Sequence, residues 1–109
     1  MTDKELLELA AKAEGRAIKY MKIIDGNGKK IGEEFIACWN PLTDDGDALR
    51  LAVKLSLVVW DWEQYQKAMA EVRHGAARGE YWEDVGTNPC AATRRAIVRA
   101  AAEIGKSMP

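Results

Sequence analysis

The segment from Trp39 to Leu55 constrains the fold most, because a proline, a group of capping residues and a helical apolar pattern follow one another directly. Pro41 fixes its own φ and favours an extended Asn40, so we expect the chain to arrive extended and then turn. Thr43, Asp44 or Asp45 can cap the first N–H groups of a helix. The apolar residues recur at helical spacing, at Ala48, Leu51, Ala52 and Leu55. The segment therefore predicts a helix from about Asp45 to Leu55, with Arg50 and Lys54 facing solvent.

The acidic residues Asp44, Asp45 and Asp47 also raise the possibility of a divalent-metal site. Their spacing does not follow the EF-hand loop, which places oxygen ligands at alternate positions and ends in a distant Glu. Capping is therefore the favoured interpretation, and we expect neither a metal nor any other cofactor.

Length and charge limit the classes of protein. A chain of 109 residues is most simply one domain, spanning residues 1–109, and can bury a core of its own. The net charge of −1 gives no overall argument for nucleic-acid binding. Cys38 and Cys90 lie far apart in apolar or helical contexts, which predicts reduced, buried thiols. Neither a signal peptide nor a membrane-spanning apolar run is evident, so we expect a cytoplasmic protein without membrane contact.

Two further helices have clear start signals. Thr2 and Glu5 form a capping-box pattern, which predicts a helix from Asp3 to Glu14 that ends near Gly15. Its expected apolar residues are Leu6, Leu9, Ala10 and Ala13. Asn88-Pro89 predicts a cap followed by proline at the first helical position, so the last helix should run from Pro89 to about Gly105. Its expected apolar residues are Cys90, Ile97, Val98, Ala101 and Ile104.

The remaining segments favour strands. Residues 16–24 and 30–38 flank the turn Asp25-Gly26-Asn27-Gly28 and predict a β-hairpin. Ser56 to Trp62 is β-branched and aromatic, with Leu57, Val59 and Asp61 on one face. Residues 63–74 fit either helix or strand, and the Gly-rich stretch before the strand expected at Glu80–Val85 favours a strand at 67–74. The order is α-β-β-α-β-β-β-α, which predicts an α+β fold with a mainly antiparallel sheet covered by helices.

Two segments, 39–55 and 88–105, resemble small proteins of temperate bacteriophages and prophages that carry the phage ABA-sandwich domain. The resemblance rests on the Trp-Asn-Pro-Leu-Thr-Asp-Asp turn into a central helix, and on the Asn-Pro start of an Ala-rich final helix. It implies a helix-sheet-helix sandwich and a phage or prophage origin. It implies no catalytic residues, and no family motif matches residues 57–87.

The last helix carries a candidate nucleic-acid-binding ridge. Arg95, Arg99 and Lys106 project to nearly the same side, with Arg94 at the margin of the apolar stripe. A row of such cations would suit a phosphate backbone. The alternative, which we favour, is a solvated face whose later cations also suit the negative end of the helix.

Three tryptophans form a candidate partner-binding face. Trp60 and Trp62 share one face of the expected strand, and Trp82 is expected on a neighbouring strand. Exposed, these rings would suit a protein partner or a stacked base. The favoured alternative is a sheet face buried under a helix, because aromatic residues dominate protein cores.

No catalytic motif is present. His74 has no nucleophile within a recognisable motif, Gly26-x-Gly28 lacks the rest of a phosphate loop, and the adjacent Glu33 and Glu34 point to opposite faces of a strand. We therefore expect a non-enzymatic phage accessory protein that binds a host or phage protein. A small nucleic-acid-binding module is the alternative. A homodimer through a sheet edge or the aromatic face is also consistent with a small α+β domain.

Overall fold

The expected order of elements is confirmed in a computed structural model, which describes residues 1–17, 20–35, 39–73 and 75–109. Within these ranges, three α-helices and five strands follow one another in the order α-β-β-α-β-β-β-α, so the fold is α+β. The elements are α1 (Asp3–Glu14), β1 (Tyr20–Ile24), β2 (Lys30–Phe35), α2 (Asp45–Lys54), β3 (Val58–Trp62), a 3₁₀ turn (Glu63–Tyr65), β4 (Lys67–Val72), β5 (Gly79–Asp84) and α3 (Pro89–Ser107).

The helices begin where local hydrogen bonding predicts. Thr2 accepts the Glu5 N–H at the start of α1, Asp44 accepts the Asp47 N–H at the start of α2, and Asn88 accepts the Ala91 N–H at the start of α3. Each cap satisfies a helix-terminal N–H that has no partner within the helix. Gly15 ends α1 in the left-handed conformation, with φ of 79°. The predicted helix starts are therefore confirmed.

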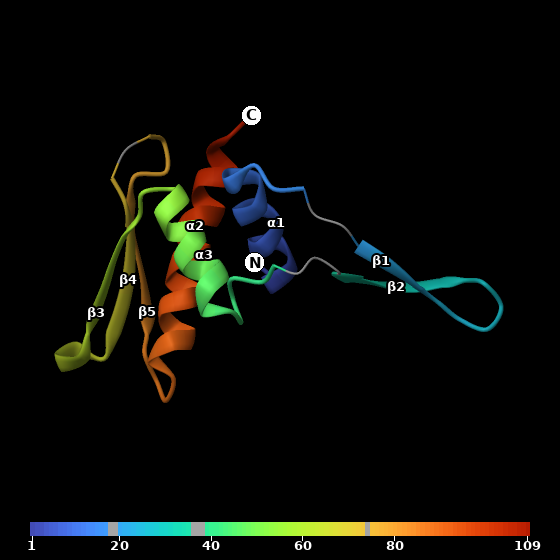
Figure 1. The fold of residues 1–109 in the computed structure, drawn as a ribbon, viewed down its shortest axis with the longest axis horizontal. Helices are drawn as coiled ribbons and strands as arrows, with labels where there is room; N and C mark the ends of the chain where they lie inside the picture. The colour runs from blue at the N-terminus through green and yellow to red at the C-terminus, as the bar shows by residue number, and fades with distance from the viewer. Residues whose placement is uncertain (18–19, 36–38, 74) are drawn as a thin grey trace.

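The five strands are divided between two antiparallel sheets. Strands β3, β4 and β5 form a meander in that order, and β1 and β2 form a separate two-stranded sheet. Residues 67–72 are confirmed as a strand, which settles the ambiguity between helix and strand in this segment. All three helices lie on one side of the three-stranded sheet, with α2 and α3 next to the sheet and α1 beyond them (Figure 1).

The core lies between α3 and its neighbours. Helix α3 packs on α1, on α2 and on the sheet, and its buried residues are mostly alanine. The side of β4 that faces α3 also carries small residues, namely Ala68 and Ala70, and both are fully buried. The buried residues of α1 are Leu6, Leu7, Ala10, Ala11 and Glu14, so the expected burial of Leu6 and Ala10 is confirmed, whereas Leu9 and Ala13 are half-buried.

The last helix ends slightly beyond its expected end. It was expected to run to about Gly105, and α3 continues to Ser107 with Gly105 buried inside it. A Cβ at this position would lie 2.0 Å from the carbonyl oxygen of Leu9. Gly105 therefore allows the backbones of α1 and α3 to approach each other, and it does not stop the helix.

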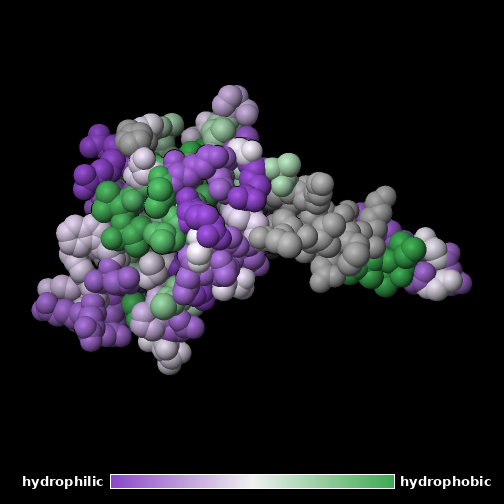
Figure 2. Space-filling model, viewed as in Figure 1, coloured by the Kyte–Doolittle hydropathy of each residue, from purple (hydrophilic) through white to green (hydrophobic). Residues whose placement is uncertain are grey.

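The β1–β2 hairpin stands away from the helices and the larger sheet (Figure 1). The turn is made as predicted, since the Asp25 carboxylate accepts the N–H groups of Asn27 and Lys29. The radius of gyration is 15.3 Å, against about 13 Å for a globular chain of this length. Figure 2 shows apolar surface on the hairpin, where Ile23, Ile24 and Ile31 are exposed.

Candidate functional site

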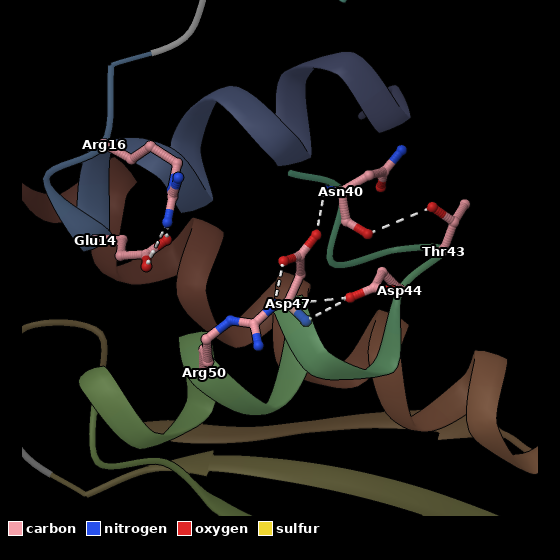
Figure 3. A network of polar contacts seen from close by, with 7 residues as sticks. All are labelled: Glu14, Arg16, Asn40, Thr43, Asp44, Asp47 and Arg50. Atoms are coloured by element: carbon pink, nitrogen blue, oxygen red, sulfur yellow. Dashed lines mark hydrogen bonds and ion pairs between the residues drawn. The ribbon is translucent and has the colours of Figure 1, made fainter. Parts of the chain in front are cut away.

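The acidic residues at the start of α2 form a structural network (Figure 3). Asp44 caps the helix, and the carboxylate of Asp47 accepts the Asn40 N–H at 2.8 Å and an Arg50 N–H at 2.7 Å. Burial raises the pKa of Asp47, but these hydrogen bonds and the Arg50 charge outweigh it, so the pKa lies below its ordinary value. Within the described ranges, no three His, Cys, Asp or Glu side chains are placed to share a metal ion. The network holds the Asn40–Asp44 turn against α2.

The prediction of buried thiols can be checked for Cys90 only. Cys90 was expected to be buried, and this is wrong, because the first turn of α3 is exposed and burial begins at Ala92. Cys38 and His74 lie outside the described residues, as do residues 18, 19, 36 and 37.

The arginines of α3 make contacts within the chain. Arg99 pairs with Glu83 and donates to the Trp82 carbonyl, and Arg95 pairs with Asp3 and Glu83. Lys106 is exposed at the other end of the helix. Arg94 also turns inward and donates to the Leu42 carbonyl. The two guanidinium groups of the predicted ridge therefore tie α3 to β5 and α1, which matches a structural role better than a row of phosphate contacts.

The tryptophans are divided between the core and the surface. Trp39 is 3% exposed and packs under the Arg16 guanidinium. Trp60, Trp62 and Trp82 are 47%, 41% and 36% exposed, so the interpretation that a helix covers these three rings is wrong. The predicted sharing of one face by Trp60 and Trp62 is confirmed by the strand register.

Strand register explains why the three rings are uncovered. Trp60 lies opposite Met69, and Met69 lies opposite Trp82, so the three side chains share one side of the sheet. Asp61, Ala68 and Glu83 form the next row and point to the other side, where Thr93 donates to Asp61 and Arg99 pairs with Glu83. Because Thr93 and Arg99 belong to α3, the tryptophan side must be the one away from the helices.

This surface, which we call the aromatic face, consists of Trp60, Trp62, Tyr65, Met69 and Trp82. The Trp62 ring lies at its centre, with centroid distances of 6.0 Å to Trp60, 5.5 Å to Trp82 and 5.4 Å to Tyr65. A shallow hollow of about 220 Å³ lies among the rings, lined by Trp60, Trp62, Met69, Glu71, Arg73, Glu80 and Trp82. The sequence analysis did not single out Glu71 and Glu80. Strand alternation places Glu80 on the same side as Trp82, whereas Glu71 comes beside the rings only through the strand register.

A second apolar surface lies between α2, β3 and the start of α3. Leu49 and Val53 of α2 are 64% and 70% exposed, and Val59 of β3 is 38% exposed. Figure 2 shows apolar surface beside α2, facing the sheet. A hollow of about 260 Å³ lies here, lined in part by Leu49, Val59 and Ile97. It is aliphatic and lacks the clustered rings of the aromatic face.

No helix within the described residues has the length and apolar character needed to cross a membrane. Comparison with protein-family models, curated proteins and solved structures gives no match to this chain. The assignment of function therefore depends on the surfaces themselves.

Proposed function

We propose that this chain is a phage or prophage accessory protein of the host cytoplasm, without catalytic activity of its own, that binds another protein through its aromatic face. The observation that carries the proposal is the exposure of three clustered tryptophans on the sheet side away from the helices. Trp and Tyr are enriched among the residues that dominate binding energy at protein interfaces. The resemblance to small phage proteins at residues 39–55 and 88–105 supports the phage origin.

The sheet offers a rigid platform for such an interface. Its three strands are fully paired in register, and α3 supports β4 and β5 from behind. The rings also hold one another through edge and tilted contacts. Rigid aromatic side chains lose little conformational entropy on binding, so a preformed cluster of this kind favours affinity.

The test is affinity capture from a lysate of the bacterial host, after nuclease treatment, with the unmodified chain and two double variants. Trp60→Ser/Trp62→Ser removes rings from the aromatic face, whereas Leu49→Ser/Val53→Ser removes comparably exposed apolar residues elsewhere. A protein retained by the unmodified chain and by the Leu49/Val53 variant, but lost from the Trp60/Trp62 variant, is the expected result. Equal retention by both variants would refute the proposal, provided that circular dichroism shows both to be folded.

Two related measurements distinguish a protein partner from a second copy of this chain and from a nucleic acid. Sedimentation of the unmodified chain and the Trp60/Trp62 variant shows whether the partner is a second copy. Recovery of nucleic acid alone from an untreated lysate would favour the alternative of a nucleic-acid-binding module.

A further inference from the structure

We infer that the hollow on the aromatic face receives an arginine side chain from a basic segment of the partner protein. This inference rests on the proposed function and specifies the chemistry of the partner. It starts from the acidic side chains beside the rings, which the proposed function does not use.

Two carboxylates stand side by side next to the tryptophans. Glu71 and Glu80 are direct cross-strand partners on β4 and β5, and both line the hollow together with Trp60 and Trp82. Like charges directly opposite each other on a sheet face destabilise it. Arg73 pairs with Glu71 at 3.2 Å, whereas Glu80 accepts only the indole N–H of Trp82, at 3.0 Å, from within the described part of the chain. The position of Glu80 therefore favours a cation supplied from outside.

The tryptophan rings also favour a cation. The face of an indole ring carries negative charge density and binds cations, most favourably with Trp. Arginine suits both features, because its planar guanidinium stacks on aromatic rings while its N–H groups pair with a carboxylate. Aromatic and acidic groups thus meet around one hollow. Arg73 also lines it and pairs with Glu71, so Glu80 is the carboxylate that would receive the arginine.

The size and charge of the hollow favour a single basic side chain over larger or anionic occupants. At about 220 Å³ it is smaller than the roughly 300–1,000 Å³ typical of pockets for whole small ligands, so it suits a single side chain. A nucleic-acid backbone would bring phosphates toward Glu71, Glu80 and Asp84. The cations on this side, Lys67 and Arg73, are already paired with Asp84 and Glu71. The charge of the face therefore favours a basic peptide over a nucleic acid.

The test uses N-acetyl-arginine methylamide as the probe and the matching citrulline compound, which has nearly the same shape but no charge, as its control. The indole N–H signals of the unmodified chain are followed by NMR at millimolar probe concentrations. The signals of Trp60, Trp62 and Trp82 should shift saturably with the arginine probe and not with citrulline. The signal of buried Trp39 should stay in place and serves as an internal control.

Glu80→Gln is the decisive variant, because the amide oxygen can still accept the Trp82 N–H while the charge is removed. Loss of one charge-assisted contact at an exposed site should raise the dissociation constant about three- to tenfold. Equal shifts with citrulline, no shift of the three signals, or unchanged affinity in Glu80→Gln would each overturn the inference. A single-stranded oligonucleotide that shifts the same signals more strongly than the arginine probe would overturn it too.

Failure of the arginine inference can be distinguished from failure of the proposed function. If a captured protein is lost from the Trp60→Ser/Trp62→Ser variant but retained by Glu80→Gln, the aromatic face binds a protein and the arginine inference fails. If capture does not depend on the tryptophans, the proposed function itself fails.

Discussion

Replacing Gly105 with alanine should destabilise the protein, although alanine is the better helix former. A Cβ at Gly105 would stand 2.0 Å from the carbonyl oxygen and 2.8 Å from the carbonyl carbon of Leu9. Ordinary van der Waals contact begins near 3.4 Å, so α1 and α3 would have to separate by about 1.4 Å. The obstacle is backbone, which no change of side-chain rotamer can move.

The size of the effect follows from two opposing terms. Alanine gains about 1 kcal/mol over glycine inside a helix, whereas overpacking a close contact costs about 1–3 kcal/mol and occasionally more. A gap of 0.5–1 Å already forfeits roughly a quarter to a half of the dispersion attraction between packed atoms, and α1 buries Leu6, Leu7, Ala10 and Ala11. The overpacking cost should therefore reach about 3 kcal/mol, which leaves a net loss of about 2 kcal/mol.

Equilibrium unfolding in urea, with Gly46→Ala as the matched control, measures this difference. A Cβ at Gly46 would meet the Arg50 guanidinium at 3.2 Å and the Asp44 carboxylate at 3.3 Å. Both groups end side chains and need to shift by only a few tenths of an ångström, although Asp44 caps α2 and Arg50 contacts Asp47. The helix preference for alanine and this small rearrangement oppose each other, so Gly46→Ala should change the stability by no more than about 1 kcal/mol in either direction. The midpoint of thermal unfolding should fall by about 8–16 °C in Gly105→Ala. Equal or higher stability of Gly105→Ala would refute the close approach of the two helices.

Four further predictions concern the network, a cap, the tryptophans and the hairpin. Asp47→Asn should lower the free energy of unfolding by about 1–3 kcal/mol at pH 7, because the charged contact with a guanidinium is lost. Since folding lowers the pKa of Asp47, its contribution is present above the unfolded pKa of about 3.9 and is lost as pH falls through the folded value. The difference between the two chains in urea titrations should therefore shrink below pH 4, and a constant difference would contradict this reasoning. Asn88→Ala should cost about 1 kcal/mol through loss of the cap, measured in the same way. Acrylamide should quench most of the tryptophan fluorescence and leave a blue-shifted component from Trp39; emission that resists quenching throughout would contradict the exposure of the aromatic face. Replacing Tyr20–Phe35 with a short Gly/Ser linker should leave the thermal midpoint within a few degrees, since β1 and β2 mainly contact each other and stand away from the helices (Figure 1). Loss of the cooperative unfolding transition in this variant would contradict the prediction.

The features that could be predicted from the sequence depend on nearby residues. Thr2, Asp44 and Asn88 each cap a helix through a bond to a residue three positions ahead, so a few letters suffice to place the helix starts. The hairpin turn at Asp25 is local in the same sense.

The features that could not be predicted from the sequence depend on residues far apart in the chain. Gly105 resembles a helix stop until its distance to Leu9, nearly the whole length of the chain away, is known. Cys90 occupies an apolar position of a helical pattern, but exposure depends on where the neighbouring elements end. Glu71 and Glu80 become neighbours only through the register of β4 and β5.

The aromatic face shows why an apolar strand pattern does not reveal which side is buried. Both sides of β3 carry large apolar residues, and by hydrophobicity alone the tryptophan side is the better candidate for the core. The neighbouring strand decides the outcome, because the α3 side of β4 carries Ala68 and Ala70 and α3 itself is rich in buried alanine. Small residues on both surfaces allow the helix and the sheet to lie close together, which leaves no room for indole rings between them. The tryptophans are therefore placed on the opposite side of the sheet, where the rings are exposed and stand beside Glu80.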